Sequence, residues 1–243
     1  MDKRNSRIRK RPTRTTAKRS VRERLIDVAE DVFADRGYGA SSLEEIARAI
    51  GIGASAVYRH FRNKLALYEA VVDRLAQRHL ALLQGFEPDI NGVEFSGRNF
   101  RFHATHPALA RIALQASMAG SEQRRIVVEK LIQPIFRHCN QKMRKSDLIS
   151  ARELSRNPSH YMAFVSLTYG YVNLAPLFRE AVGFDPLSEW AVNDGVEIVE
   201  KFAWSINREA EEGVASYKNR DITRPDSPAA RRTGRRGSRM PAA

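Results

Sequence analysis

The stretch GIGASA, residues 51–56, has the G-x-G-x-x-A spacing that lets a backbone approach the pyrophosphate of a dinucleotide. In such a site the phosphate meets a helix N-terminus at the end of a β-strand, so the motif predicts this chemistry only after a strand. The preceding residues show no strand pattern, because apolar side chains recur at the spacing of one helix face: Leu43, Ile46, Ala47 and Ile50. Gly51 therefore fits the tight turn of a helix-turn-helix, where glycine accepts positive φ freely.

A second constellation lies in the segment VYRHFRNK, residues 57–64. A phenol at Tyr58 and an imidazole at His60 can each donate a hydrogen bond to a phosphate oxygen, and Lys64 adds a full positive charge. Ser42 would place a hydroxyl at the positive dipole end of the preceding helix. Tyr58 could instead be an amphipathic core residue, His60 a surface histidine and Lys64 a solvated charge. Together, the four predict contacts to a nucleic-acid backbone.

Helices are the elements that must position these residues. Ser42 and Glu45 have the spacing of a capping box, which predicts a helix that ends at Ile50. The next helix is expected from Ala54 to His60, and Asn63 is a suitable cap for a fourth. An amphipathic helix precedes them and stops at the Gly37 and Gly39 break; its apolar residues are Leu25, Ile26, Val28, Ala29, Val32 and Phe33.

The rest of the chain also shows helix starts and stops and no run of alternating β-branched residues. Further helices are expected near Pro107, Ser121, Asn157 and Pro186. The fold class is all-α, with an N-terminal three-helix helix-turn-helix DNA-binding domain and a larger C-terminal helical domain. The expected domains are a basic arm at 1–19, the helix-turn-helix domain at 20–66, the helical domain at 67–212 and a basic tail at 213–243.

The net charge of +13 is concentrated at the two ends of the chain. Residues 1–24 contain 11 Lys or Arg and 2 acids, and residues 213–243 contain 8 and 2, whereas residues 25–212 contain 22 and 24. The basic ends lack hydrophobic periodicity and are rich in Arg, Ser, Thr, Pro and Gly, so we expect them to be disordered in isolation. The body is almost neutral, and the basic ends would supply the long-range attraction to DNA.

The sequence lacks the residues that several kinds of site require. The single cysteine, Cys139, excludes an intramolecular disulfide framework or a Cys-based zinc finger and is expected to be a small buried side chain. His103 and His106 have no carboxylate or cysteine in register, so no metal site is expected. The motifs G-x-S-x-G, H-E-x-x-H and the P-loop are absent. We expect no cofactor and no enzymatic activity.

The segment Tyr161–Phe178 tests for a membrane span, because its 18 residues carry no charge. It includes Ser166, Thr168, Asn173 and Pro176, which weaken its transfer into lipid, so a buried helix is the better interpretation. No apolar segment follows the basic N-terminus, so no secretory signal is expected. These observations predict a cytoplasmic protein without a membrane partner.

From Leu25 to Leu67 the chain resembles the tetracycline-repressor (TetR) family, most specifically in VYRHF followed by Lys64. The resemblance implies that Ala54–His60 is a recognition helix in the major groove. Its small residues Ala54, Ser55 and Ala56 make few bidentate base contacts, although alanine can touch a thymine methyl. Direct readout is therefore expected to depend also on four larger side chains: Tyr58, Arg59, Arg48 and Glu44.

The resemblance also implies that the C-terminal helices dimerise and hold a small effector. Apolar and aromatic residues that could line such a site are Phe102, Leu114, Met118, Phe136, Met162, Phe164 and Tyr169. Possible polar anchors are Asn173, His138 and Arg101, and the alternative for all of them is core packing. The dimer is expected through the last two long helices, with an apolar stripe at Val192, Val196, Val199, Phe202 and Ala203.

These features predict a homodimeric transcriptional regulator, most simply a repressor. It would bind a palindromic operator in double-stranded DNA and release it when a small-molecule effector binds. A non-specific DNA-compacting protein is the alternative, because Arg-rich ends bind any duplex through its phosphates. A helical enzyme is a third alternative, for which no catalytic constellation is present.

Overall fold

The computed structural model describes residues 20–85, 92–145 and 158–212, and every regular element within these ranges is a helix. The basic arm at 1–19 and the tail from 213 lie outside the described residues. The helices are α1 (Val21–Arg36), α2 (Leu43–Ala49), α3 (Ala54–Val57), α4 (Lys64–Gln84), α5 (Gly92–Thr105), α6 (Pro107–Met118), α7 (Ser121–Val127), the π-helical segment Val128–Ile132, α8 (Gln133–Lys145), α10 (Pro158–Val182) and α11 (Glu189–Glu212).

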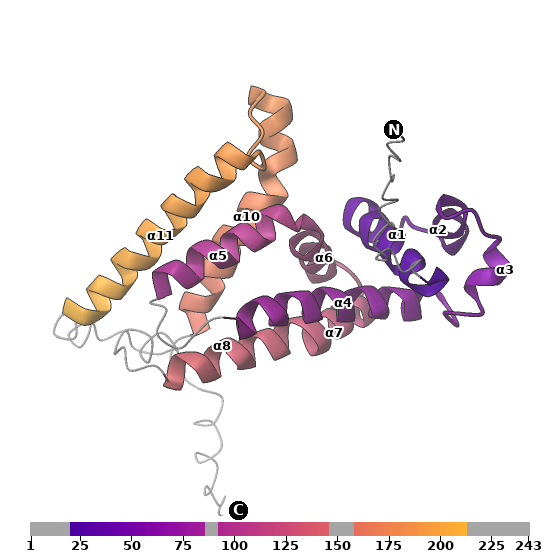
Figure 1. Cartoon of the computed structure of the whole chain (residues 1–243), viewed down its shortest axis with the longest axis horizontal. Helices are drawn as coiled ribbons and strands as arrows, with labels where there is room; N and C mark the ends of the chain where they lie inside the picture. Colours follow the sequence, from indigo (N-terminus) through magenta and orange to yellow (C-terminus); the bar gives the residue numbers. More distant parts are fainter. Residues whose placement is uncertain (1–19, 86–91, 146–157, 213–243) are drawn as a thin grey trace, which may run out of the picture.

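Helices α1–α3 lie at one end of the molecule, and α4 leads from them into the rest of the chain (Figure 1). Helix α1 packs on α4 and α6, while α4 packs on α7, the π-helical segment and α8. Helix α10 crosses α5 and α6, and α11 lies along α5. Because α4 begins at Lys64, the domain boundary expected between 66 and 67 falls inside one continuous helix.

Two apolar clusters hold these helices together. The larger one extends from α1–α4 to α6–α8 and includes Phe33, Leu67 and Leu131, which are fully buried. The helix-turn-helix therefore shares one continuous core with α4 and α6–α8. Cys139 belongs to it, as expected, and burial raises the pKa of its thiol to about 12.

The smaller cluster joins α5 to α11 through Phe100, Ala104, Val192 and Val199. The two helices approach closely at Gly195, where an added Cβ would lie 2.7 Å from the ring of Phe100. This corrects the stripe expected at the dimer interface, since Val192 and Val199 are buried within one protomer. Phe202 is 41% exposed, so it alone of these three faces outward.

The uncharged segment Tyr161–Phe178 forms the middle of α10, and the expectation of a buried helix is correct for one face only, since Leu174, Leu177 and Phe178 are exposed. Thr168, Val172 and Ala175 on this helix are buried. Among the described helices, none combines the length and the apolar composition that crossing a bilayer requires.

Candidate nucleic-acid interface

Ser42 begins α2 as expected, because its Oγ accepts a hydrogen bond from the Glu45 backbone N–H at 3.1 Å. The second half of the predicted capping box is wrong, since the Glu45 carboxylate pairs with Arg36 of α1. A complete capping box is found instead at the start of α1, between Ser20 and Glu23. The α2 helix is therefore tied sideways to α1, which fixes its orientation in the helix-turn-helix.

Gly51 forms the turn between α2 and α3 with φ of +74°. Its N–H donates to the Arg48 carbonyl at 3.1 Å, and the Ile52 N–H donates to the Ala47 carbonyl at 3.0 Å. A left-handed residue with these two bonds ends α2 and redirects the chain toward α3. This confirms the turn predicted from the glycine, and the described residues before it are helical rather than extended.

The recognition helix is shorter than expected, since α3 covers only Ala54–Val57. The His60 N–H donates to the Val57 carbonyl at 2.8 Å, and this i→i+3 bond tightens the chain after Val57. The Phe61 N–H also donates to the Val57 carbonyl, at 2.9 Å, and both side chains are buried. The helical element thus gives way to a turn after Val57, while Val57 and Phe61 stay on the same inner face.

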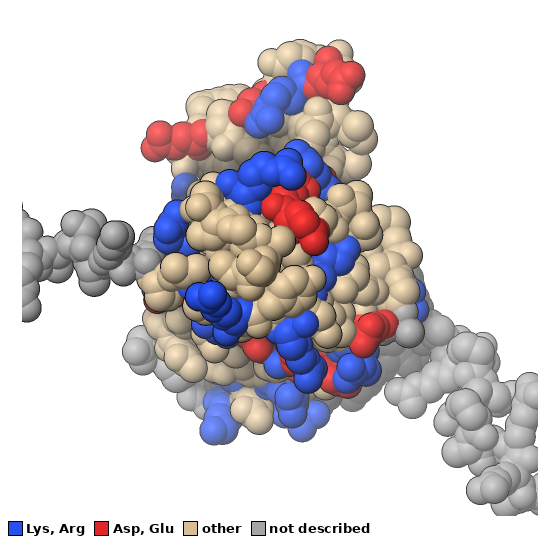
Figure 2. All heavy atoms as spheres, turned by 90° about the vertical axis from the view of Figure 1, so that its right-hand side faces the viewer, with Lys and Arg blue, Asp and Glu red and all other residues tan. Residues whose placement is uncertain are grey.

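The side chains expected to touch DNA lie at this end of the molecule, which faces the viewer in Figure 2. Tyr58 is 55% exposed although it follows a buried valine. The remaining candidates divide between exposed Glu44, Arg48, Ser55, Arg59 and His60 and half-buried Ser42, Ala54, Ala56 and Lys64. The exposed residues come from both α2 and the α3 region, so two segments present them on one helix-turn-helix.

Lys64 has contacts that the sequence did not reveal. Its Nζ donates to the Tyr38 carbonyl at 2.7 Å and to the Ser41 carbonyl at 2.8 Å, and it lies 4.2 Å from the centroid of the Tyr38 ring. These contacts tie the start of α4 to the loop between α1 and α2. Because an ammonium has three N–H groups, one donor remains beyond these two carbonyls. Lys64 is thus a positioning residue, and its phosphate contact stays a prediction.

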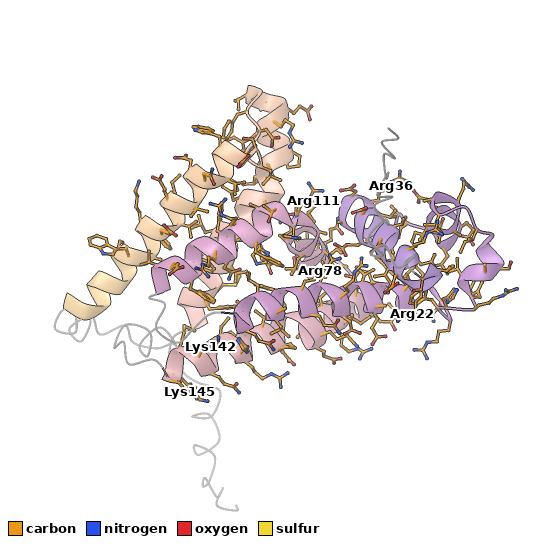
Figure 3. The ribbon with its side chains drawn as sticks, viewed as in Figure 1. Arg22, Arg36, Arg78, Arg111, Lys142 and Lys145 are labelled. Carbon is orange, nitrogen blue, oxygen red and sulfur yellow. The ribbon has the colours of Figure 1, made fainter. Side chains whose placement is uncertain are left out.

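Two arginines of α1 also belong to this end, and sequence reasoning missed them. The Arg22 guanidinium lies 5.1 Å from the centroid of the Phe61 ring, and Arg24 donates to the Ile50 carbonyl at 2.8 Å. Figure 3 places Arg22 at the helix-turn-helix end, near the start of α4, whereas Lys142 and Lys145 lie at the opposite end of the molecule. The signal was present in the basic first turn of α1, next to the N-terminal arm.

Polar contacts join α1 to the helices behind it. Arg74 of α4 pairs with Asp27 and Glu30 and donates to the Ile26 carbonyl at 2.9 Å. From α6, Arg111 pairs with Asp35 at 2.7 Å and the Gln115 side chain donates to the Ala34 carbonyl at 2.9 Å. Helix α1 is therefore held by both α4 and α6, and a displacement of either would be transmitted to the helix-turn-helix.

The structure separates the residues expected to line an effector site. Leu114, Met118 and Met162 are 42%, 74% and 65% exposed, so they lie on the surface of the protomer, and a lining role for them stays a prediction. On α6 the inward face is formed by Leu109, Ile112 and Ala116, and Leu114 and Met118 lie off that face. On α10, Met162 is one position away from the ring of Tyr161, which packs on Phe136.

The other expected lining residues lie in the interior but in different places. Phe136 contacts Tyr161, with ring centroids 5.1 Å apart, while Phe164 packs in the α5–α11 cluster. The Asn173 amide donates to the carbonyls of Tyr169 at 2.8 Å and Ala110 at 3.3 Å, so it ties α10 to α6. Arg101 donates to Asn193 of α11 at 2.7 Å on the surface, and the His138 Nε2 atom is buried without a partner among the described residues.

Phe102 and Tyr169 instead flank a buried polar cluster that sequence reasoning missed. His79 of α4 lies 3.1 Å from the Asn99 Oδ1 atom, and its ring centroid lies 4.7 Å from that of His103. Burial lowers the pKa of His79 to about 4, although the bond to Asn99 opposes this, and burial also lowers the pKa of His103. The available signal was His79 in the apolar stripe of α4, four residues after Leu75.

Comparison with known proteins identifies the family. Residues 25–71 match the family model described as bacterial regulatory proteins, tetR family. The HTH-type transcriptional repressor Rv3405c of Mycobacterium tuberculosis is 30% identical over 189 residues, which cover 74% of this chain and 89% of that protein. The chain belongs to the TetR family. The TetR family match confirms the resemblance found in the sequence and the all-helical fold.

Two further similarities differ in extent. SrpR, an HTH-type transcriptional regulator of Pseudomonas putida, is 42% identical over 76 residues, or 31% of this chain, and the match spans only 34% of SrpR. A solved transcriptional regulator from Aquifex aeolicus has a TM-score of 0.58 and 20% identity, with 77% of this chain and 99% of that chain covered. At this identity the Aquifex structure shows a shared fold alone. The relatives are named as transcriptional regulators rather than enzymes.

Proposed function

We propose that this TetR-family regulator is a repressor that binds a palindromic operator as a homodimer and releases it when a small effector binds. The proposal rests on one observation above all: the Gly51 turn holds the exposed side chains around Tyr58 next to those of α2. Repression, rather than activation, is proposed because the Rv3405c relative is named a transcriptional repressor. We place the protein in the cytoplasm and assign it no catalytic role.

The proposed docking puts α3 in the major groove. Ser42, Tyr58, His60 and Lys64 would contact phosphates, since they offer hydroxyl, imidazole and ammonium donors at the edges of the helix pair. Arg22 joins them, because its guanidinium lies over the ring of Phe61, which follows α3 in the chain. Base edges would be read by Glu44, Arg48, Ala54, Ser55, Ala56 and Arg59.

The homodimer is proposed through the outer surfaces of α10 and α11. Large apolar side chains on these helices are exposed in one protomer, which is typical of an association surface. They are Leu167, Leu174, Leu177, Phe178, Val182, Trp190, Ile198, Phe202 and Trp204. A second copy that presents the same two helices would cover them in a self-complementary contact.

Effector control is proposed to act through α4 and α6, which enclose α1 and carry the Arg74, Arg111 and Gln115 contacts to it. A molecule bound among the helices of the body would favour one arrangement of α4 and α6. Linkage then requires that operator binding and effector binding weaken each other to the same extent.

The proposal is tested by incubating the purified protein with fragmented genomic DNA and sequencing the bound fragments. A specific repressor enriches a few fragments that share a palindrome, and it prefers that site over bulk DNA by at least ~10³. The Arg59→Ala variant should keep its affinity for random DNA and lose part of this preference. Uniform recovery of fragments would contradict the proposal and support a DNA-compacting protein.

A further inference from the structure

Several buried side-chain atoms of the described residues have no hydrogen-bond partner, and two of them belong to adjacent rings in the interior of the body: Nδ1 of His79 and Nδ1 of His103. The two side chains are 3% and 2% exposed, and their rings meet edge to face. Buried polar atoms in folded proteins are nearly always paired, because an unpaired one loses its bonds to water without compensation. Two such atoms on adjacent rings indicate a site built for a ligand.

The bond to Asn99 fixes what His79 can offer. Its Nε2 atom lies 3.1 Å from the Asn99 Oδ1 atom, which only accepts hydrogen bonds, so Nε2 carries the proton. A neutral imidazole has one protonated nitrogen, and the other nitrogen carries a lone pair. Nδ1 of His79 is therefore an acceptor, and its partner must be a donor.

The surroundings of this acceptor are uncharged. The buried polar residues of the described chain are Ser41, His79, Ser96, Asn99, His103 and Thr168, and no Asp, Glu, Lys or Arg is among them. A carboxylate or an ammonium at this place would lack an opposite charge, and burial of an unpaired charge is strongly unfavourable. The donor is thus a neutral group such as a hydroxyl.

Aromatic rings enclose the two histidines. Phe102 stacks on His79 with centroids 5.1 Å apart, and Tyr169 meets the edge of His103 at 5.0 Å. Phe102 also stacks on His106, with centroids 4.8 Å apart, but His106 is exposed and therefore lies at the surface beside the cluster rather than within it. Rings in these orientations favour a flat apolar body.

We propose that the cluster of His79, Asn99 and His103 binds an uncharged aromatic molecule whose hydroxyl group donates a hydrogen bond to Nδ1 of His79. The molecule inserts between α4, α5 and α10, beside Phe102 and Tyr169. Its identification as the effector rests on the proposed function, but its binding does not.

The binding test uses two matched sets of probes on the full-length protein. Phenol, anisole, benzoate and benzylammonium form one set, and 2-naphthol, 2-methoxynaphthalene, 2-naphthoate and 2-naphthylmethylammonium form the other. Calorimetry should show that phenol or 2-naphthol binds. Its methyl ether, which lacks the donor, should bind with an affinity at least about tenfold lower. The anions and cations should bind more weakly than the phenol of the same set.

Variants assign the effect to the cluster. His79→Phe keeps a planar ring and removes the acceptor, so it should abolish the preference for the phenol over its ether. His106→Phe, at an exposed position outside the cluster, is the matched control and should leave the preference intact. If His79→Phe fails to fold, the ¹⁵N resonance of His79 Nδ1 in the wild-type protein should shift on addition of the bound phenol and not with its ether.

Three results would overturn the inference: equal binding of phenol and ether, tighter binding of an anion or cation, or no binding by any probe up to its solubility limit. Operator binding is measured separately with the selected DNA. A phenol that binds at His79 without changing operator affinity contradicts effector control and leaves the site standing. If an effector releases the operator equally well from wild type and from His79→Phe, the cluster is not the effector site, whereas the proposed repressor function is retained.

Discussion

The Nζ atom of Lys64 lies 2.7 Å from the carbonyl oxygen of Tyr38 and 4.2 Å above that residue's ring. The first residue of α4 is thereby attached to the loop between α1 and α2, which precedes the helix-turn-helix. The lysine that most resembles a DNA contact in the sequence is part of the framework that positions the side chains proposed to contact DNA.

Replacement of Lys64 by methionine should therefore reduce both stability and DNA affinity. Two carbonyls lose their donor, so the free energy of unfolding is expected to fall by about 1–3 kcal/mol in urea titrations. Tyr58→Phe removes only an exposed hydroxyl and should weaken binding to operator and random DNA alike, with stability unchanged. Lys201→Met, at an exposed pair with Glu197, is the control and should stay within about 0.5 kcal/mol of the wild type. If Lys64→Met lost DNA binding but kept the stability of the wild type, the positioning role would be contradicted and Lys64 would act only as a phosphate contact.

Gly51→Ala should destabilise the helix-turn-helix through the backbone. Its φ of +74° costs a non-glycine residue about 1–2 kcal/mol, although nothing lies within 4 Å of the added Cβ. Gly39→Ala is the matched control, since Gly39 has equal space and is not among the positive-φ glycines. Thermal unfolding followed by circular dichroism distinguishes the two, and equal melting temperatures would show that the turn tolerates alanine.

Charges on the outer faces of α10 and α11 should produce monomers. Leu177 and Trp190 are 61% and 68% exposed, so Leu177→Asp and Trp190→Asp are expected to fold and to sediment as monomers. Met118→Asp, at a 74% exposed position on α6, should remain dimeric. Val199→Asp should unfold instead, because Val199 is buried against α5 within the protomer. Undiminished dimers in both α10 and α11 variants would place the interface elsewhere.

Acid should destabilise the body through His79. The pKa of His79 is about 4 in the folded protein and about 6.5 when unfolded, so the fold favours the neutral ring. This stability is present above pH 6.5 and is lost as the pH falls from 6.5 toward 4. Between pH 7 and pH 5 the loss due to His79 is about 2 kcal/mol. Urea titrations of the wild type and of His79→Phe at pH 7 and pH 5 measure the loss of unfolding free energy. Equal losses in the two proteins would show that His79 is not the source. His103 is present in both proteins and acts in the same direction, so it does not produce a difference between them.

Removal of residues 1–17 should flatten the salt dependence of DNA binding. This segment, outside the described residues, contains one acid, Asp2, and seven basic residues: Lys3, Arg4, Arg7, Arg9, Lys10, Arg11 and Arg14. Each phosphate that they neutralise contributes about 0.9 to the slope of log affinity against log salt, so the slope should fall by several units per dimer. Preference for A·T-rich flanks should fade, because a basic arm favours a narrow minor groove.

The matched control removes residues 231–243, which include the Arg231–Arg239 cluster, and should change the slope less. Base preference at the centre of each half-site should persist in both truncations, since the α2–α3 side chains read it. An unchanged slope after removal of residues 1–17, with a reduced one after removal of the C-terminal segment, would assign the electrostatic role to the other end of the chain.

The sequence alone determined the local features of the DNA-binding end. Ser42, Gly51 and Asn63 act within three or four residues of their own position, as caps and a turn, so their roles follow from residue type and spacing. The all-helical class followed for the same reason, since the period of apolar residues is set by the helix itself. The resemblance to the TetR family depended on this same local segment.

The tertiary structure decided the features that depend on which helix packs on which. Lys64 meets a loop 26 residues earlier, Val199 is buried by α5 rather than by a second copy, and Met118 faces outward. The pairing of His79 with Asn99 and His103 likewise joins two helices across the interior. Apolar periodicity predicts that a residue lies on a buried face, but it does not predict what covers that face. The hydrophobic free energy depends on the apolar area removed from water and hardly on which partner removes it.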